Sequence, residues 1–201
     1  MPSETTDVAA WLRAQPSLSG NAPAWDIGDL PAAPEDLFVA WLTQAIDDGV
    51  AEPLAATLAT VGSDGVPDAR TLILKDVDAR GWAFAGPRAS RKAAQLAAHP
   101  AGALNFWWQP LVRAVRVRGH VEEASPDESA ADLASRPAPA RAGLGPDRWV
   151  LWRLIPERVE FWQGAPDRRH TRIVYERRDG EWTRAAIAGV PVIEEEQPRN
   201  D

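Results

Sequence analysis

The chain has no cysteine among its 201 residues and only three histidines, His99, His120 and His170. Without thiols it cannot form a disulfide, use a cysteine nucleophile or bind a metal through thiolates. The three histidines also lack the close spacing of zinc ligands. We therefore expect no metal site.

The chain also lacks a long apolar run and an excess of basic residues. No stretch approaches about 18 apolar residues, and the first twenty residues are polar and acidic, so we expect neither a membrane span nor a signal peptide and predict a cytoplasmic protein. The net charge of −7 argues against general nucleic-acid binding, because counterion release requires a basic face.

The composition is that of an ordinary globular protein. Hydrophobic residues make up 45% of the chain and charged residues 25%, which predicts one domain. Residues 1–34 are rich in Pro, Ala, Gly and Ser, so we expect a flexible N-terminal arm. The predicted domain spans residues 35–190, and a polar tail follows at 191–201.

Hydrophobic spacing predicts one long helix and then many short strands. Apolar residues recur at helical intervals over Pro34–Ile46, which indicates a helix that faces the core. Residues 57–61 and 67–75 flank a turn at 62–65 and predict a β-hairpin. We expect a turn at 76–81 and further strands at 81–86, 103–108 and 113–118. Frequent short strands favour a β-barrel with flanking helices.

Two further helices have recognisable start signals. Ser90 is suited to cap a helix that ends near His99. Ser125 and Glu128 form a capping box that opens a helix ending at Arg136. Asp132 and Arg136 are four residues apart on that helix, so we expect them to pair on its surface.

Positive side chains gather near the end of the chain. If residues 168–172 are extended, Arg168, His170 and Arg172 project from one face, next to the aromatic segment that contains Trp162. Guanidinium groups in such a rim suit a phosphate or the carbonyl groups of a flavin. A basic surface strand beside a core tryptophan is the simpler interpretation of this segment alone.

A second group of cations lies far upstream. Arg70 and Lys75 bracket a β-rich run, and Arg91 and Lys92 lie at the start of the helix capped by Ser90. Cations at a helix N-terminus oppose the helix dipole unless an anion lies between them. Free N–H groups together with Arg and Lys favour phosphate, so these residues predict a phosphorylated cofactor.

Six segments in this order resemble the pyridoxamine/pyridoxine 5′-phosphate oxidases of vitamin B6 metabolism. That family consists of dimeric split β-barrels that bind FMN, which is the fold and cofactor we expect here. The resemblance covers roughly residues 35–190. Its segments are Arg70–Lys75, Ser90–Lys92, Arg113–Arg116, Ser135–Pro137, Glu160–Gly164 and Arg168–Arg172.

The resemblance implies a site for each ligand. The implied FMN ligands are Arg70, Thr71, Leu72, Ile73, Leu74, Lys75, Ala85, Gly86, Arg91, Lys92, Trp162 and Arg172. The implied substrate ligands are Lys75, Arg136, Arg168 and His170, of which His170 and Arg168 lie near the reacting carbon. The implied reaction transfers a hydride from the substrate to flavin N5, and O2 then reoxidises the flavin to give H2O2. The resemblance also implies a homodimer with FMN at the interface and a small, phosphorylated substrate.

Several positions depart from the family pattern. Ala114 replaces a glutamine, Asp132 a tyrosine and Ala140 a serine, and only residues 138–148 connect two motifs that a longer segment joins in the family. Asp132 introduces repulsion toward a phosphate dianion. Three hypotheses follow: a pyridoxine/pyridoxamine 5′-phosphate oxidase, a diverged FMN oxidase of another reduced ring of the phenazine-pathway type, or a non-catalytic flavin or pyridoxal-phosphate binding protein.

Overall fold

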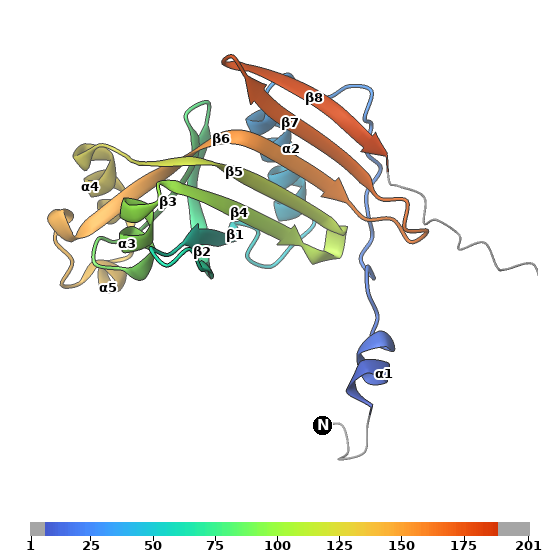
Figure 1. Ribbon diagram of the computed structural model, residues 1–201, viewed down its shortest axis with the longest axis horizontal. Coiled ribbons are helices and arrows are strands. Elements are labelled where there is room, and N and C mark those ends of the chain that lie inside the picture. Colours follow the sequence, from blue (N-terminus) through green and yellow to red (C-terminus); the bar gives the residue numbers. More distant parts are fainter. Residues whose placement is uncertain (1–6, 189–201) are drawn as a thin grey trace, which may run out of the picture.

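The computed structural model describes residues 7–188 and shows a closed antiparallel barrel of six strands (Figure 1). The strand order is β3-β2-β1-β4-β5-β6, and pairing of β3 with β6 closes the barrel. The predicted barrel with flanking helices is therefore confirmed. The barrel strands are β1 Ala55–Val61, β2 Pro67–Asp78, β3 Gly81–Pro87, β4 Ala101–Trp108, β5 Arg113–Glu123 and β6 Trp149–Gln163.

Alternation of side chains builds the barrel core. In β5 the buried Val115 and Val117 point inward, whereas Arg116 and Arg118 lie on the exposed face. Leu58, Leu104 and other apolar side chains from the facing strands fill the interior. The predicted polar tail at 191–201 and the first six residues of the arm lie outside the described residues.

Helix α2, Pro34–Asp47, packs its apolar face on the barrel. Phe38 lies edge-on to Trp82 at 5.6 Å and to Phe106 at 4.9 Å between ring centroids. The prediction that Ile46 faces the core is wrong, because this side chain is 53% exposed. Ile46 lies one residue after the buried Ala45, in the last turn of the helix, and the turn carries it to the solvent side.

Buried Arg113 joins this helix to the end of the barrel. Its Nε donates to Gln163 at 2.7 Å and its Nη1 donates to Gln44 of α2 at 2.7 Å. The guanidinium also lies 4.1 Å from the ring centroid of Trp41. Burial lowers the pKa of Arg113 to about 10. Arg113 therefore has a structural role.

Two further helices begin at the capping residues that the sequence indicates. Helix α3, Arg91–Ala98, has Ser90 as its N-cap, and α4, Pro126–Ser135, opens with the predicted capping box. Both start signals are confirmed. Short elements fill the connections: α5 Ala138–Arg141, η1 Gln109–Leu111 and η2 Pro146–Arg148.

Strand β2 is longer than the sequence indicates. The turn predicted at 76–81 shrinks to Ala79 and Arg80, because the ladder with β3 shifts register between Leu74 and Asp76 and continues to Asp78. Arg153 of β6 contacts Asp76 at 2.8 Å and Asp78 at 3.3 Å. These ion pairs hold the polar end of β2 in the sheet.

A hairpin extends the sheet beyond the barrel. Strands β7, Thr171–Arg178, and β8, Glu181–Ala188, continue from β6 and lie at the opposite end of the molecule from α4 and α5 (Figure 1). None of the helices within residues 7–188 combines the length and hydropathy needed to cross a membrane.

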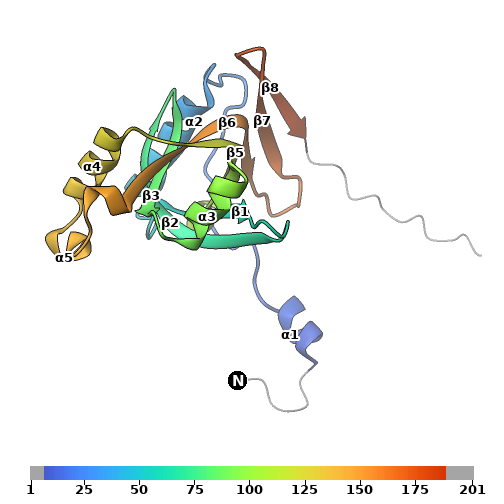
Figure 2. The same cartoon turned by 60° about the vertical axis from the view of Figure 1, so that its left-hand side comes forward.

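The arm leaves the barrel and carries one short helix. Helix α1, Val8–Arg13, stands away from the barrel in both views (Figures 1 and 2). Closer to the domain, Asn21 N donates to Pro110 O at 2.8 Å, and Tyr175 Oη donates to Pro31 O at 2.9 Å. These bonds fix the path of residues 21–31 along the domain. The flexibility of the arm as a whole stays a prediction.

Candidate cofactor and substrate site

Three cations and one carboxylate meet between β2 and α3. This β2–α3 cluster consists of Arg70, Arg91, Lys92 and Asp68. Asp68 Oδ2 lies 3.1 Å from Nη2 of Arg70 and 3.5 Å from Nη1 of Arg91. Of the upstream cations that the sequence singled out, Arg70, Arg91 and Lys92 are therefore brought together, from two elements distant in sequence.

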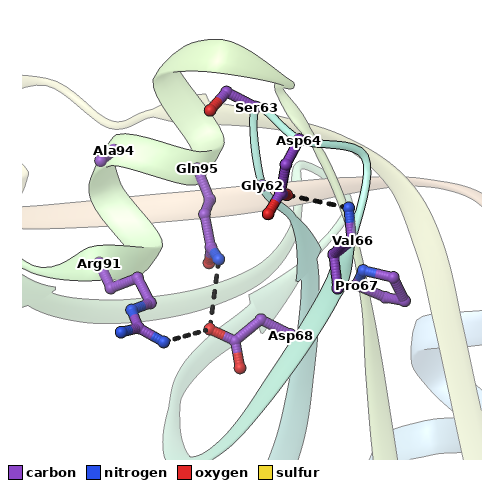
Figure 3. Close-up of a pocket in the computed structure, with 9 residues that line it drawn as sticks. All are labelled: Gly62, Ser63, Asp64, Val66, Pro67, Asp68, Arg91, Ala94 and Gln95. Atoms are coloured by element: carbon purple, nitrogen blue, oxygen red, sulfur yellow. Dashed lines mark hydrogen bonds and ion pairs between the residues drawn. The ribbon is translucent and has the colours of Figure 1, made fainter.

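Two polar residues that the sequence reasoning missed hold Arg70 in place. Arg70 donates to Thr60 Oγ1 at 2.5 Å and to Gln95 Oε1 at 2.7 Å, and Gln95 Nε2 donates to Asp68 at 3.2 Å. Figure 3 shows Arg91 and Gln95 of α3 both pointing at Asp68 across an open cleft of about 520 Å³. A signal was present, since Gln95 follows Arg91 by four residues and shares its helix face.

Lys92 is the least compensated cation of this cluster. It is half-buried, and burial, followed by the nearby charge of Arg70, lowers its pKa. Its Nζ lies 3.4 Å from Ser90 Oγ, and no carboxylate of residues 7–188 is within ion-pair distance. Gly86 gives Lys92 its room, because a Cβ there would collide with Nζ. The absence of a side chain at Gly86 therefore leaves the space that Lys92 occupies.

The β2–α3 cluster fits a phosphate group. Its single carboxylate leaves two positive charges uncompensated, and a phosphate monoester carries about −1.5 to −2 at neutral pH. The first turn of α3 adds free N–H groups beside these cations. Bound phosphate would also offset the repulsion between Lys92 and Arg70.

Other predicted ligands on these strands are placed by the alternation of β2. Leu72 and Leu74 pack toward the core, whereas Thr71 and Ile73 lie on the exposed face. Ala85 and Gly86 of β3 pair with Leu151 and Val150 of β6.

A second charged group lies where α4 meets β6. This α4–β6 cluster consists of Lys75, Asp132, Arg136 and Trp149. Asp132 Oδ1 lies 3.6 Å from Lys75 Nζ, and Oδ2 accepts a hydrogen bond from Trp149 Nε1 at 2.7 Å. The predicted pairing of Asp132 with Arg136 is wrong, because the carboxylate turns toward Lys75 and Trp149. Arg136 instead lies over Trp149, 4.5 Å from its ring centroid.

The third group lies where β6 ends and β7 begins. The predicted extended face of Arg168, His170 and Arg172 is wrong. Arg168 lies in a turn with a left-handed φ of 64°, and β7 starts only at Thr171. His170 N donates to Arg168 O at 3.0 Å, so the chain folds back. Arg168 therefore points to the arm, where it donates to Ser17 Oγ at 3.3 Å.

His170 and Trp162 nevertheless lie together. Their ring centroids are 4.8 Å apart, and His170 Nδ1 accepts a hydrogen bond from Ala165 N at 3.1 Å. On the other side, Trp107 lies 6.1 Å from Trp162. Ala114 faces both tryptophans in the strand register, so its small side chain lets the rings approach. The departure at Ala114 thus belongs to an aromatic surface.

Glu160 organises the cations of this region, a role the sequence reasoning missed. Its side chain is only 4% exposed although it lies on the outer face of β6. It contacts Arg116 at 2.5 Å, Arg158 at 3.1 Å and Arg172 at 3.3 Å. Glu160 stands two residues before Trp162, and this same-face spacing was the available signal.

Within one chain the first and third groups are far apart. The register places Arg70 opposite Leu58, Leu58 opposite Leu104, Leu104 opposite Val117, and Val117 opposite Val159. Through β3 only two strand spacings separate β2 from β6, but that path meets β6 at Trp152, ten residues before Trp162. Through β1, β4 and β5, four strand spacings of about 4.8 Å, roughly 19 Å along the barrel wall, separate Arg70 from Val159. Trp162 lies three residues further along β6. The structure therefore does not bring the β2–α3 cluster to Trp162, His170 and Arg172 of the same chain.

Comparison with known proteins gives concordant matches along the chain. Residues 42–163 match the family model described as pyridoxamine 5′-phosphate oxidase. Residues 149–188 match the model described as the C-terminal dimerisation region of pyridoxine 5′-phosphate oxidase.

Curated relatives and solved structures agree with these models. A pyridoxine/pyridoxamine 5′-phosphate oxidase from Thermosynechococcus vestitus is 39% identical, with 79% of this chain and 90% of that protein covered. One from Ralstonia pickettii is 40% identical, with 81% and 92% covered. PhzG from Burkholderia lata, solved with tetrahydrophenazine-1-carboxylic acid, has a TM-score of 0.79 at 25% identity and covers 84% of this chain and 100% of its own. An FMN-binding protein from Nostoc punctiforme shares the fold, with a TM-score of 0.66 at 21% identity, covering 79% of this chain and 99% of its own.

Proposed function

The chain belongs to the pyridoxamine 5′-phosphate oxidase family, and from this premise we propose that it is an FMN-dependent oxidase acting on a carbon that bears an amine or alcohol on a small ring. The single observation that most supports FMN as the cofactor is the β2–α3 cluster. The cluster has two uncompensated positive charges, Gly86 leaves room for Lys92, and the N-terminus of α3 adjoins both. These features suit the FMN phosphate. Arg70, Arg91 and Lys92 would hold that phosphate.

We propose that two copies complete each site. Trp162 and Arg172, expected beside the flavin ring, lie far along the barrel wall from Arg70, which supports their supply by a second chain. Residues 149–188 match a dimerisation region. Ile73 is 41% exposed and Trp107 45% exposed on the outer barrel wall, and such apolar side chains suit burial against a partner.

The protein's own residues would orient the substrate. Because Nδ1 of His170 accepts the Ala165 N–H, the neutral imidazole carries its proton on Nε2 and can donate it to a substrate oxygen or nitrogen. Glu160 holds Arg172 in its place beside Trp162. FMN, when bound, supplies the acceptor for the hydride equivalent and passes its electrons to O2, which gives H2O2.

The substrate has two candidates. The curated relatives carry the name of oxidases for pyridoxine and pyridoxamine 5′-phosphate. PhzG of Burkholderia lata was solved with a reduced phenazine carboxylic acid, which favours a reduced heterocycle of that type as the second candidate. A non-catalytic flavin or pyridoxal-phosphate binding role is the third interpretation.

Cofactor and turnover can be tested separately. Purified full-length protein is titrated with FMN while flavin fluorescence is followed, and we expect saturable quenching with one FMN per chain. The loaded protein is then mixed with pyridoxine 5′-phosphate or a reduced phenazine carboxylate, and H2O2 is measured. Absence of FMN binding would contradict both oxidase candidates, whereas bound FMN without peroxide from any such substrate would favour the binding role.

A further inference from the structure

The α4–β6 cluster has a carboxylate at its centre. Asp132 is 9% exposed at its side chain, and each of its oxygens has a defined partner, Lys75 Nζ for Oδ1 and Trp149 Nε1 for Oδ2. The indole hydrogen bond at 2.7 Å fixes the orientation of the carboxylate toward Lys75. Lys75 therefore already has an anionic partner inside the protein.

Arg136 is the uncompensated cation of this cluster. Its guanidinium lies 4.5 Å from the ring centroid of Trp149, and its buried Nε has no hydrogen-bond partner. No carboxylate of residues 7–188 lies within ion-pair distance of it. Asp132 and Arg136 thus contact the same indole from different sides, one at its N–H and one at its face.

The two clusters differ by one charge. The β2–α3 cluster has three cations and one carboxylate, whereas the α4–β6 cluster has two cations and one carboxylate. The first suits a phosphate dianion. The second has one positive charge to offer, and a dianion placed at Lys75 would also meet the fixed carboxylate of Asp132. Repulsion between like charges at such range disfavours the dianion over a singly charged group.

We propose that Asp132 is a specificity-determining residue that weakens the binding of phosphate esters at the α4–β6 cluster. The substrate then presents a single carboxylate to Arg136. This inference rests on the proposed function, because it concerns the substrate of the same flavin site. It favours a ring-bearing monocarboxylate over pyridoxine or pyridoxamine 5′-phosphate. The indole of Trp149 adds an aromatic surface next to the charge that would bind the carboxylate.

Binding to the FMN-loaded, full-length protein tests the proposal. Pyridoxal 5′-phosphate and phenazine-1-carboxylate serve as phosphate and carboxylate probes, and the absorption of bound FMN is followed during each titration. We expect the wild-type protein to bind the carboxylate at least tenfold more tightly than the phosphate. A preference for the phosphate would overturn the proposal without any variant.

The substitution Asp132→Asn tests the residue itself. Asparagine keeps an oxygen that can accept the Trp149 N–H but removes the charge. We expect affinity for pyridoxal 5′-phosphate to rise at least tenfold and affinity for phenazine-1-carboxylate to change less than threefold. Asp127→Asn, on the exposed first turn of the same helix, is the matched control and should change neither.

The outcomes separate this inference from the proposed function. If the wild-type protein binds no FMN, the proposed function fails before the probes are used. If FMN binds but Asp132→Asn raises both affinities equally, or neither, the specificity role of Asp132 is overturned while the flavoprotein assignment stands. Should Asp132→Asn fail to bind FMN or to fold, the wild-type ratio of the two probe affinities decides.

Discussion

The β2–α3 cluster and the α4–β6 cluster are built from the same kinds of residue but differ in how much charge they neutralise. In the first, one carboxylate is shared by arginines, and Lys92 has no acidic partner among the described residues. In the second, the carboxylate of Asp132 pairs with the only lysine and leaves one arginine. Residual charge, more than the number of cations, therefore indicates which anion each cluster accepts.

The largest expected effect comes from the first cluster. Lys92→Met should weaken FMN binding by about 100-fold, because a charged hydrogen bond to phosphate contributes roughly 1.5–3 kcal/mol. Flavin fluorescence quenching measures the affinity. Arg88→Met is the control, since Arg88 pairs with Glu123 on the surface and should leave FMN binding unchanged. If Lys92→Met lowers FMN affinity less than threefold, the β2–α3 cluster does not bind the phosphate through Lys92.

Mixed dimers test whether Lys92 and Arg172 of one FMN site come from different chains. Lys92→Met and Arg172→Met should each weaken FMN binding, yet a dimer with one chain of each kind should regain one intact site, because the proposed site takes the two residues from different chains. The variants are unfolded together, refolded and titrated with FMN. Failure to regain any wild-type affinity in the mixed sample would place both residues in a site within one chain.

A smaller effect is expected on stability at the β6–β7 end. Glu160→Gln should lower the free energy of unfolding by about 2 kcal/mol, since it leaves Arg116, Arg158 and Arg172 without their shared partner, discounted for the exposure of those arginines. Denaturant unfolding monitored by tryptophan fluorescence measures the change. Glu123→Gln, on an exposed pair with Arg88, is the matched control and should change little.

The smallest effect is a pH dependence of cofactor binding. The pKa of Lys92 is lowered by burial and by Arg70, so this side chain loses its charge at a lower pH than an ordinary lysine as the pH rises. FMN affinity should therefore fall severalfold on the alkaline side, below the usual lysine pKa of 10.5. In Lys92→Met this alkaline fall should disappear, and its persistence there would assign it to another group.

Local signals predicted most of the fold. Ser90 and the Ser125–Glu128 capping box marked two helix starts, because capping chemistry is set by residues within one turn. The strand predicted at 113–118 is also present as part of β5, where side chains alternate between the core and the exposed face. The exception near the site was the segment before β7, where the positive φ of Arg168 breaks the extended geometry that spacing alone implies.

The site was less accessible to sequence reasoning, because its contacts join distant segments. Asp68, Gln95 and Thr60 come from three elements, and only the fold shows that they hold Arg70. Asp132 was visible as a departure, but its pairing with Lys75 and Trp149 depends on how α4 docks on β6. Long-range packing of this kind leaves no periodic trace in the chain.

The most direct measurement compares FMN with riboflavin, which lacks the phosphate, in calorimetric titrations of the full-length protein. We expect one FMN per chain and at least 100-fold weaker binding of riboflavin, because the β2–α3 cluster is proposed to bind the phosphate. Equal affinities for the two flavins, or no binding of FMN, would contradict this proposal.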